Sequence, residues 1–142
     1  MYTSSVSFVV DSSVALAWCF EDEHTPLVMD LLDRVSETGA FAPNLWPLEI
    51  LNGLLMAQRR KRLDAGRRQR LTGFLHDLPV ELDTQTADEA WKATSQLSER
   101  CRLTIYDAAY LELAQRRKLP LATLDGGLSK AGKALGMTIL GT

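Results

Sequence analysis

The sequence predicts a single α/β domain over residues 1–142, a three-layer α/β/α sandwich with a central, mainly parallel sheet. Two observations support this prediction. Short apolar runs with the composition of buried strands alternate with longer stretches of helical periodicity, and this alternation is typical of parallel sheets covered on both faces. A chain of 142 residues, with 46% hydrophobic and 24% charged residues, is also large and apolar enough to form one core.

The first strand is expected at 6–10, where "VSFVV" is β-branched and aromatic. The run Asp-Ser-Ser at 11–13 supplies good N-cap residues for a helix that continues through "VALAWCF". A second helix is indicated at 25–39, because apolar residues recur at helical spacing and a glycine closes the stretch. The chain therefore begins with a strand followed by two helices.

The middle of the chain continues the alternation. "AFAP" at 40–43 is expected to form a short strand before a helix that holds Glu49 and runs to about Arg62. Residues 64–78 have the pattern of another helix, and "VEL" at 80–82 is expected to be the next strand.

The last third is expected to hold more helices and two more strands. Residues 86–101 read as an amphipathic helix with Ala90, Trp91, Thr94 and Leu97 on one side. The remaining expected segments are a helix at 104–118, a strand at 119–124, a turn at 125–127, a short helix at 128–135 and a strand at 137–140.

The composition indicates a soluble protein of a reducing compartment. No segment approaches the roughly 20 apolar residues that a membrane span needs. The apolar N-terminal stretch lacks the basic region of a secretory signal, and Asp11 interrupts it. Cys19 and Cys101 form neither a metal motif nor a disulfide framework. We therefore expect a cytoplasmic protein with no membrane partner.

The net charge of −2 hides an uneven distribution. Residues 1–38 hold seven acids and one base, whereas residues 59–70 hold seven bases and one acid. One interpretation is structural, because cations at the end of a helix complement its dipole. The other is a surface that contacts nucleic-acid phosphates. Its residues would be Arg59, Arg60, Lys61, Arg62, Arg67, Arg68 and Arg70.

Glu49 is the residue that its own segment explains least. It lies within the apolar stretch "LWPLEILNGLLM" and shares a helix face with Asn52 and Gly53. Burying an ionised carboxylate without a partner costs several kcal/mol, and no Lys or Arg lies within one turn. The partner of Glu49 must therefore come from elsewhere in the chain.

Three further carboxylates are expected near Glu49 at one edge of the sheet. In parallel sheets, sites form beyond the carboxyl ends of the strands. Asp11 and Asp125 each follow a predicted strand, while Asp107 and Glu49 lie near the starts of helices. Like charges this close need protons or a cation, and carboxylate oxygens select a hard cation, Mg²⁺ or Mn²⁺. The partner of Glu49 would then be a metal ion.

The acids also have structural interpretations. Asp11 is placed to cap a helix, and Thr104 and Asp107 match the pattern of a capping box. Asp125, followed by glycine, is a turn signal. These interpretations remain open for each acid taken alone, whereas the four acids together are far more specific.

The other polar candidates are weaker. Ser12 and Thr123 flank the acids and would orient a carboxylate or a water, or else serve as a cap and an ordinary strand residue. His24 and His76 lack a second His or Cys at ligand spacing, so zinc is not expected. Both histidines are expected at the surface.

Four segments carry a resemblance: "VVDSS", "APNLWPLEILNGL", "LTIYDAAYLELA" and "LATLDGGL". In order and spacing the chain resembles the PIN domain over essentially its full length, and especially the VapC toxins of bacterial toxin–antitoxin pairs. The resemblance implies a ribonuclease dependent on Mg²⁺ or Mn²⁺, a homodimer, and a cognate VapB-like antitoxin whose C-terminal segment occupies the active groove. It places the acidic positions of the family at Asp11, Glu49, Asp107 and Asp125.

One segment departs from the family pattern. Relatives often have a basic residue and another acid after the last acid, whereas this chain has two glycines there.

Two other functions also stay open. Asp11 would be the nucleophile of a small-molecule phosphohydrolase, although such sites usually have a second acid where this chain has Ser13. A PIN-like module that binds RNA or protein without catalysis is the other, and the presence of all four acids counts against it.

Overall fold

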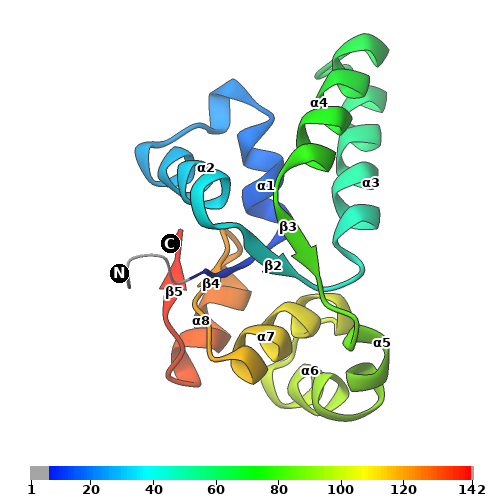
Figure 1. Cartoon of the computed structure of the whole chain (residues 1–142). Helices are drawn as coiled ribbons and strands as arrows, with labels where there is room; N and C mark the ends of the chain where they lie inside the picture. Colours follow the sequence, from blue (N-terminus) through cyan, green and yellow to red (C-terminus); the bar gives the residue numbers. More distant parts are fainter. Residues whose placement is uncertain (1–6, 142) are drawn as a thin grey trace.

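The computed structural model describes residues 7–141, so Val6 of the predicted first strand lies outside the described residues. Within them, the strands form one five-stranded sheet of order β3-β2-β1-β4-β5, and every neighbouring pair is parallel (Figure 1). All five predicted strands are present, four of them shorter than predicted. Their bounds are Val9–Val10 (β1), Ala40–Ala42 (β2), Val80–Leu82 (β3), Leu121–Ala122 (β4) and Ile139–Leu140 (β5).

Helices cover both faces of this sheet, so the predicted three-layer sandwich is confirmed (Figure 1). One face carries α1 to α4, with α1 packed against α2 and α3, and the other carries α5 to α8, with α7 packed against α8. The bounds are Ser12–Trp18 (α1), Pro26–Thr38 (α2), Trp46–Arg59 (α3), Ala65–Asp77 (α4), Thr86–Glu89 (α5), Ser95–Cys101 (α6), Ile105–Arg117 (α7) and Gly126–Ala134 (α8), with a 3₁₀ turn at Glu21–Glu23 (η2) and a π-helical turn at Ala90–Thr94 (η3).

The local signals explain most of these boundaries. Thr25 and Asp64 cap α2 and α4, since their side chains accept hydrogen bonds from backbone N–H groups in the first turn. Gly39 ends α2 with a φ of +76°, a conformation that favours glycine. α3 ends at Arg59 instead of Arg62, because Lys61 adopts a left-handed conformation.

The helix predicted at 86–101 is present, although its turn at Ala90–Thr94 (η3) is π-helical. The side given to Trp91 was wrong, because Trp91 is 88% exposed although it was expected on the same side as the buried Thr94 and Leu97. A π-turn holds more residues than an α-turn, so the direction in which side chains point shifts there. The indole of Trp91 is consequently turned to solvent.

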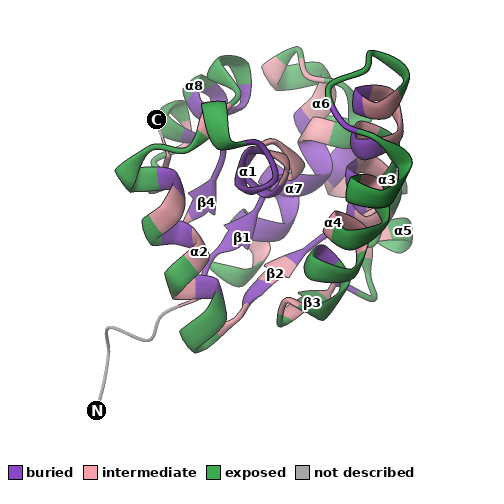
Figure 2. Cartoon of the chain, turned by 90° about the horizontal axis from the view of Figure 1, so that it is seen from above, coloured by how far each residue is buried: buried purple, intermediate pink, exposed green. Residues whose placement is uncertain are grey.

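The core is centred on β1 and α7. Phe8, Val9 and Val10 are fully buried, and α7 is buried continuously from Ala108 to Ala114 (Figure 2). Among the helices of residues 7–141, none combines the length and the apolar character needed to cross a membrane.

The strand order fixes where a site forms. β1 and β4 are neighbours, but α1 and α8, which follow them, lie on opposite faces of the sheet. This is the switch point at which parallel sheets leave a crevice beyond their carboxyl ends. Asp11 follows β1 there, and Thr123 and Asp125 follow β4.

Candidate active site

Asp11 is the most enclosed acid of the predicted site, with 4% of its surface exposed. Its Oδ2 accepts hydrogen bonds from Oγ of Ser13 and Oγ1 of Thr123, each at 2.8 Å. The side chain of Asp11 makes no capping hydrogen bond to α1, although the residue occupies the N-cap position. The structure therefore does not favour the capping interpretation: two hydroxyl groups hold this carboxylate in place.

The same two hydroxyl groups join the ends of β1 and β4. Ser13 Oγ accepts a hydrogen bond from the backbone N–H of Leu124 at 3.0 Å, and Thr123 Oγ1 accepts one from that of Asp125 at 3.0 Å. Ser12 and Thr123 were predicted as supporting residues, and the Oγ of Ser12 also donates to Oδ1 of Asp11, at 3.4 Å. Ser13 was missed.

Glu49 has a protein partner that the sequence analysis did not find. The hydroxyl of Tyr110, a fully buried residue of α7, donates a 2.5 Å hydrogen bond to Oε1 of Glu49. Tyr110 lies in an apolar helix, so the sequence pattern predicts only a core residue. The available signal was its spacing, because Asp107 and Tyr110 are three residues apart and share a helix face.

The other two acids stand at the starts of helices. Asp107 is half-buried in the first turn of α7, where its N–H donates to the Oγ1 of Thr104 at 3.1 Å. The predicted cap by Thr104 is therefore present. Asp125 is exposed and caps α8, with its Oδ2 accepting a hydrogen bond from the N–H of Leu128 at 2.8 Å. The expected turn at 125–127 is thus a helix start.

Electrostatic interactions show that the four acids lie near one another. Burial, followed by the charges of Asp11 and Asp107, raises the pKa of Glu49, against the effect of the Tyr110 hydrogen bond. Burial and then the charges of Asp11 and Asp125 raise the pKa of Asp107. Burial also raises the pKa of Asp11, although hydrogen bonds oppose it. The structure therefore brings the four predicted acids near one another, with the charge of Asp125 acting on Asp11 and Asp107.

This donor set has the chemistry of a site for a hard cation. All four groups are carboxylates, and a divalent cation would offset the repulsion among them. In the described part of the chain, however, no three His, Cys, Asp or Glu side chains are close enough to hold one ion. The types of ligand fit Mg²⁺ or Mn²⁺, while their spacing is wider than that of a bound metal site.

The basic stretch 59–70 is not part of this acidic cluster. It forms the tip of the α3–α4 hairpin, whereas Glu49 lies at the opposite end of α3 (Figure 1). Arg62 pairs with Asp22 at 3.1 Å and with Glu23 at 3.2 Å, so these acids neutralise its charge. The Nε of Arg68 donates to Gln58.

A cleft of about 430 Å³ between α1 and α3 nevertheless links the two regions. Ser13 and Leu124 line it near the acids, and Arg60 and Arg62 line it near the hairpin tip. Arg60, which unlike Arg62 makes no ion pair with the described residues, thus lines the same cleft as Ser13, whose hydroxyl bonds Asp11.

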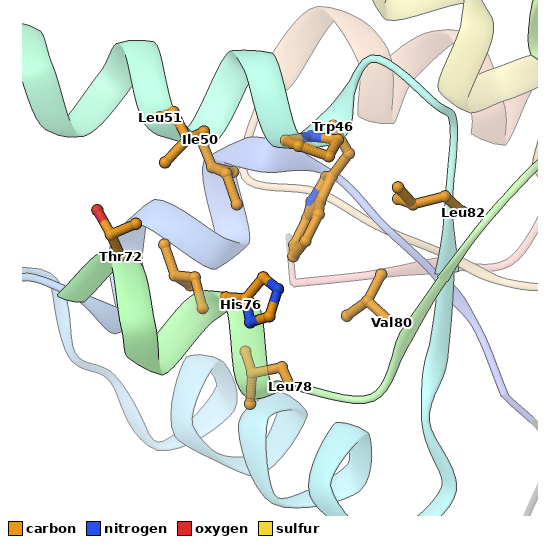
Figure 3. Close-up of a pocket in the computed structure, with 10 residues that line it drawn as sticks. Trp46, Ile50, Leu51, Thr72, His76, Leu78, Val80 and Leu82 are labelled. Atoms are coloured by element: carbon orange, nitrogen blue, oxygen red, sulfur yellow. The ribbon is translucent and has the colours of Figure 1, made fainter. Parts of the chain in front are cut away.

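Another cleft, of about 290 Å³, lies between α3, α4 and β3 (Figure 3). Its walls are mainly apolar, and none of the four acids lines it. Trp46 borders it, and the Nε1 of this buried residue has no hydrogen-bond partner among the described residues. The apolar cleft is therefore separate from the acidic site.

The family model of the PIN domain matches residues 8–134, and no curated protein matches the chain. PAE2754 from Pyrobaculum aerophilum has a TM-score of 0.69 at 21% identity, covering 95% of this chain and 90% of that one. FitAcB from Neisseria gonorrhoeae has a TM-score of 0.65 at 14% identity, covering 94% and 96%. VapC20 from Mycobacterium tuberculosis, a sarcin-ricin loop cleaving toxin, has a TM-score of 0.62 at 17% identity, covering 89% and 95%.

Proposed function

The chain belongs to the PIN domain family, and from this premise we propose that it is a metal-dependent endoribonuclease, the toxin of a type II toxin–antitoxin pair. One observation supports the proposal above the others. Four carboxylates from distant parts of the sequence lie near one another at the switch point of the sheet, where burial and then the charges of neighbouring acids raise the pKa values of Asp11, Glu49 and Asp107. A metal-dependent hydrolase that acts on phosphodiesters uses such a cluster to bind its cation.

In this proposal Asp11 and Asp107 hold the cation, with Glu49 and Asp125 beside them. Bound Mg²⁺ or Mn²⁺ would supply an activated water and offset the charge that develops on the phosphate oxygens. The chain's own residues orient the ligands. Hydroxyl groups of Ser13 and Thr123 fix the Asp11 carboxylate, and Tyr110 fixes that of Glu49.

The proposed substrate is single-stranded or loop RNA, whose backbone is free to enter a groove. By resemblance to the family, the products would carry 5′-phosphate and 3′-hydroxyl ends. The basic stretch 59–70 is proposed to contact the RNA backbone, and Arg60 is its best-placed residue because it lines the cleft that reaches Ser13.

The proposed partners are a cognate VapB-like antitoxin and a second copy of this chain, in the cytoplasm. Exposed apolar side chains stand directly beside the acids. Leu48, which precedes Glu49, is 74% exposed, and Tyr106, which precedes Asp107, is 64% exposed. Large apolar residues exposed at such a site favour coverage by another protein.

The test is cleavage of a structured RNA pool by purified protein with Mg²⁺, Mn²⁺ or EDTA, beside the variant Asp107→Asn. The variant keeps the shape of the side chain and removes its charge. Cleavage that needs metal and is lost in the folded variant supports the proposal. Equal cleavage by both proteins contradicts it. Turnover of a small phosphate ester in place of RNA would indicate a phosphohydrolase, and RNA binding without cleavage would indicate a non-catalytic module.

A further inference from the structure

We propose that the cleft between the α6–α7 loop and α8 binds the phosphodiester backbone of the RNA next to the acidic site. The cleft has a volume of about 400 Å³. Three cations line it: Arg100, Arg102 and Lys130. None of them belongs to the basic stretch 59–70. We name RNA as the ligand because the proposed function is that of a ribonuclease, so this inference rests on the proposed function.

The cleft opens beside two of the four acids. Gly127 lines it, and a Cβ atom placed on Gly127 would lie 3.4 Å from Oδ2 of Asp125. Leu103 also lines it and is followed by Thr104, whose hydroxyl bonds the N–H of Asp107. A strand whose scissile phosphate lies at the acids would therefore have this cleft beside it.

The charge of the cleft is uncompensated. Arg100, Arg102 and Lys130 are exposed, and none of them makes an ion pair with any residue of 7–141. No acid is among the residues that line the cleft. The cleft between α1 and α3 differs, because Glu23 lines it and pairs with Arg62. A protein with a net charge of −2 needs a local positive surface to hold a polyanion near its carboxylates.

Hydrogen bonds anchor the backbone of the loop that carries Arg102. Arg102 ends α6 in the left-handed region, with a φ of +57°. Ser98 fixes the next residue twice: its Oγ donates to the carbonyl oxygen of Leu103 at 2.6 Å, and its carbonyl oxygen accepts from the N–H of Leu103 at 3.0 Å. Lys130 faces this loop from α8 across the cleft.

The test is RNA binding by the full chain in EDTA, where metal-dependent cleavage is stopped. A fluorescently labelled short single-stranded RNA is titrated at several KCl concentrations with wild type, the double variant Arg102→Asn and Lys130→Gln, and the control Lys133→Gln. Asn tolerates the left-handed conformation of residue 102. Lys133 is an exposed lysine of the same helix that does not line the cleft.

The double variant is expected to bind about 10-fold more weakly and to lower the salt slope by about 1.4, because each phosphate contact in single strands contributes about 0.7. The control should bind like wild type. Equal affinity and slope for the double variant and the control would overturn the proposal, as would a wild type that does not bind RNA at low salt.

A cleavage assay separates this proposal from the proposed function. In the presence of metal, the double variant should raise KM and leave kcat unchanged, since the cleft binds the ground state and the transition state alike. Metal-dependent cleavage with a normal KM in the double variant would contradict RNA binding by the cleft and support the proposed nuclease activity. RNA binding that depends on the cleft, without any cleavage, would support the cleft as a binding site and contradict the proposed nuclease activity.

Discussion

Tyr110 donates a 2.5 Å hydrogen bond to Oε1 of Glu49 and so joins α7 to α3 across the candidate site. The same helix carries Asp107 one turn earlier. α7 therefore presents a carboxylate of its own and also holds the carboxylate of a neighbouring helix. Because α7 is buried along most of its length, both groups stand on a rigid support.

Tyr110→Phe is expected to lower the free energy of unfolding by about 2 kcal/mol, because a half-buried carboxylate loses its hydrogen-bond donor. Metal-dependent cleavage of RNA should also fall, since Glu49 is no longer oriented. Urea denaturation and a cleavage assay measure the two effects. Tyr106→Phe is the matched control, because Tyr106 lies on the same helix but is exposed. Equal stability and equal cleavage rates for the two variants would contradict the positioning role of Tyr110.

Thr123→Val is expected to impair cleavage while Thr123→Ser largely retains it. The valine keeps the shape of a fully buried side chain but removes the hydroxyl that donates to Asp11 and accepts from the N–H of Asp125. The serine keeps that hydroxyl. Cleavage rates of both variants at saturating RNA check this expectation, and a serine variant as impaired as the valine variant would show that packing of the methyl group matters instead.

Arg116→Ala is expected to lower the free energy of unfolding by about 3 kcal/mol, because it leaves two buried carboxylates without their cation. Arg116 pairs with Asp83 at 2.6 Å and with Glu112 at 2.8 Å, and these acids are 3% and 4% exposed. Urea denaturation measures the loss. Arg70→Ala, which truncates an exposed arginine of α4, should change stability by less than about 0.5 kcal/mol.

The same ion pair predicts a pH dependence. Burial alone would raise the pKa of Asp83, but hydrogen bonds from Arg116 and neighbouring groups bring it below its usual value. An acid with a lowered pKa stabilises the folded state at pH values above its pKa in the unfolded state, about 3.9. This stabilisation is lost as the pH falls through the pKa of Asp83 in the folded state. Stability should therefore decrease below about pH 4, and the decrease should be shallower in Asp83→Asn. Parallel curves for the two proteins would contradict this assignment.

Gly39→Ala and Gly73→Ala are expected to change stability in opposite directions. Gly39 has a φ of +76°, and a Cβ there would lie 3.0 Å from the carbonyl oxygen of Pro79, so alanine should cost about 1 to 2 kcal/mol. Gly73 lies within α4 with nothing near its missing Cβ, so alanine should stabilise by about 0.5 to 1 kcal/mol. Midpoints of urea denaturation measure both.

The sequence was sufficient for features whose signals are local or repeat along the chain. Alternation of strands and helices predicted the sheet and its layers, and the cap at Thr104 was predicted from the capping-box pattern that it forms with Asp107. The convergence of Asp11, Glu49 and Asp107 followed from a rule about strand ends. The lengths of the strands could not be predicted, because hydrogen bonding in the sheet depends on neighbouring strands that are distant in the sequence.

Features that depend on contacts between distant segments were missed. Tyr110 has an ordinary core environment in its own helix, and only the fold brings Glu49 to its hydroxyl. The contact of Ser13 with Asp11 likewise depends on the direction of the first turn of α1. Trp91 was misplaced because a π-turn changes the helical period without a marker in the sequence.

The central claim is that Asp11, Glu49, Asp107 and Asp125 form one site for a divalent cation. Binding of Mn²⁺, followed by loss of the electron paramagnetic resonance signal of the free ion, tests it most directly. Wild type should bind Mn²⁺, Asp107→Asn should bind it about 10-fold more weakly or worse, and Asp33→Asn, an exposed acid of α2, should bind it like wild type. Circular dichroism confirms that the variants are folded. Failure of wild type to bind Mn²⁺, or equal binding by Asp107→Asn, would contradict the claim.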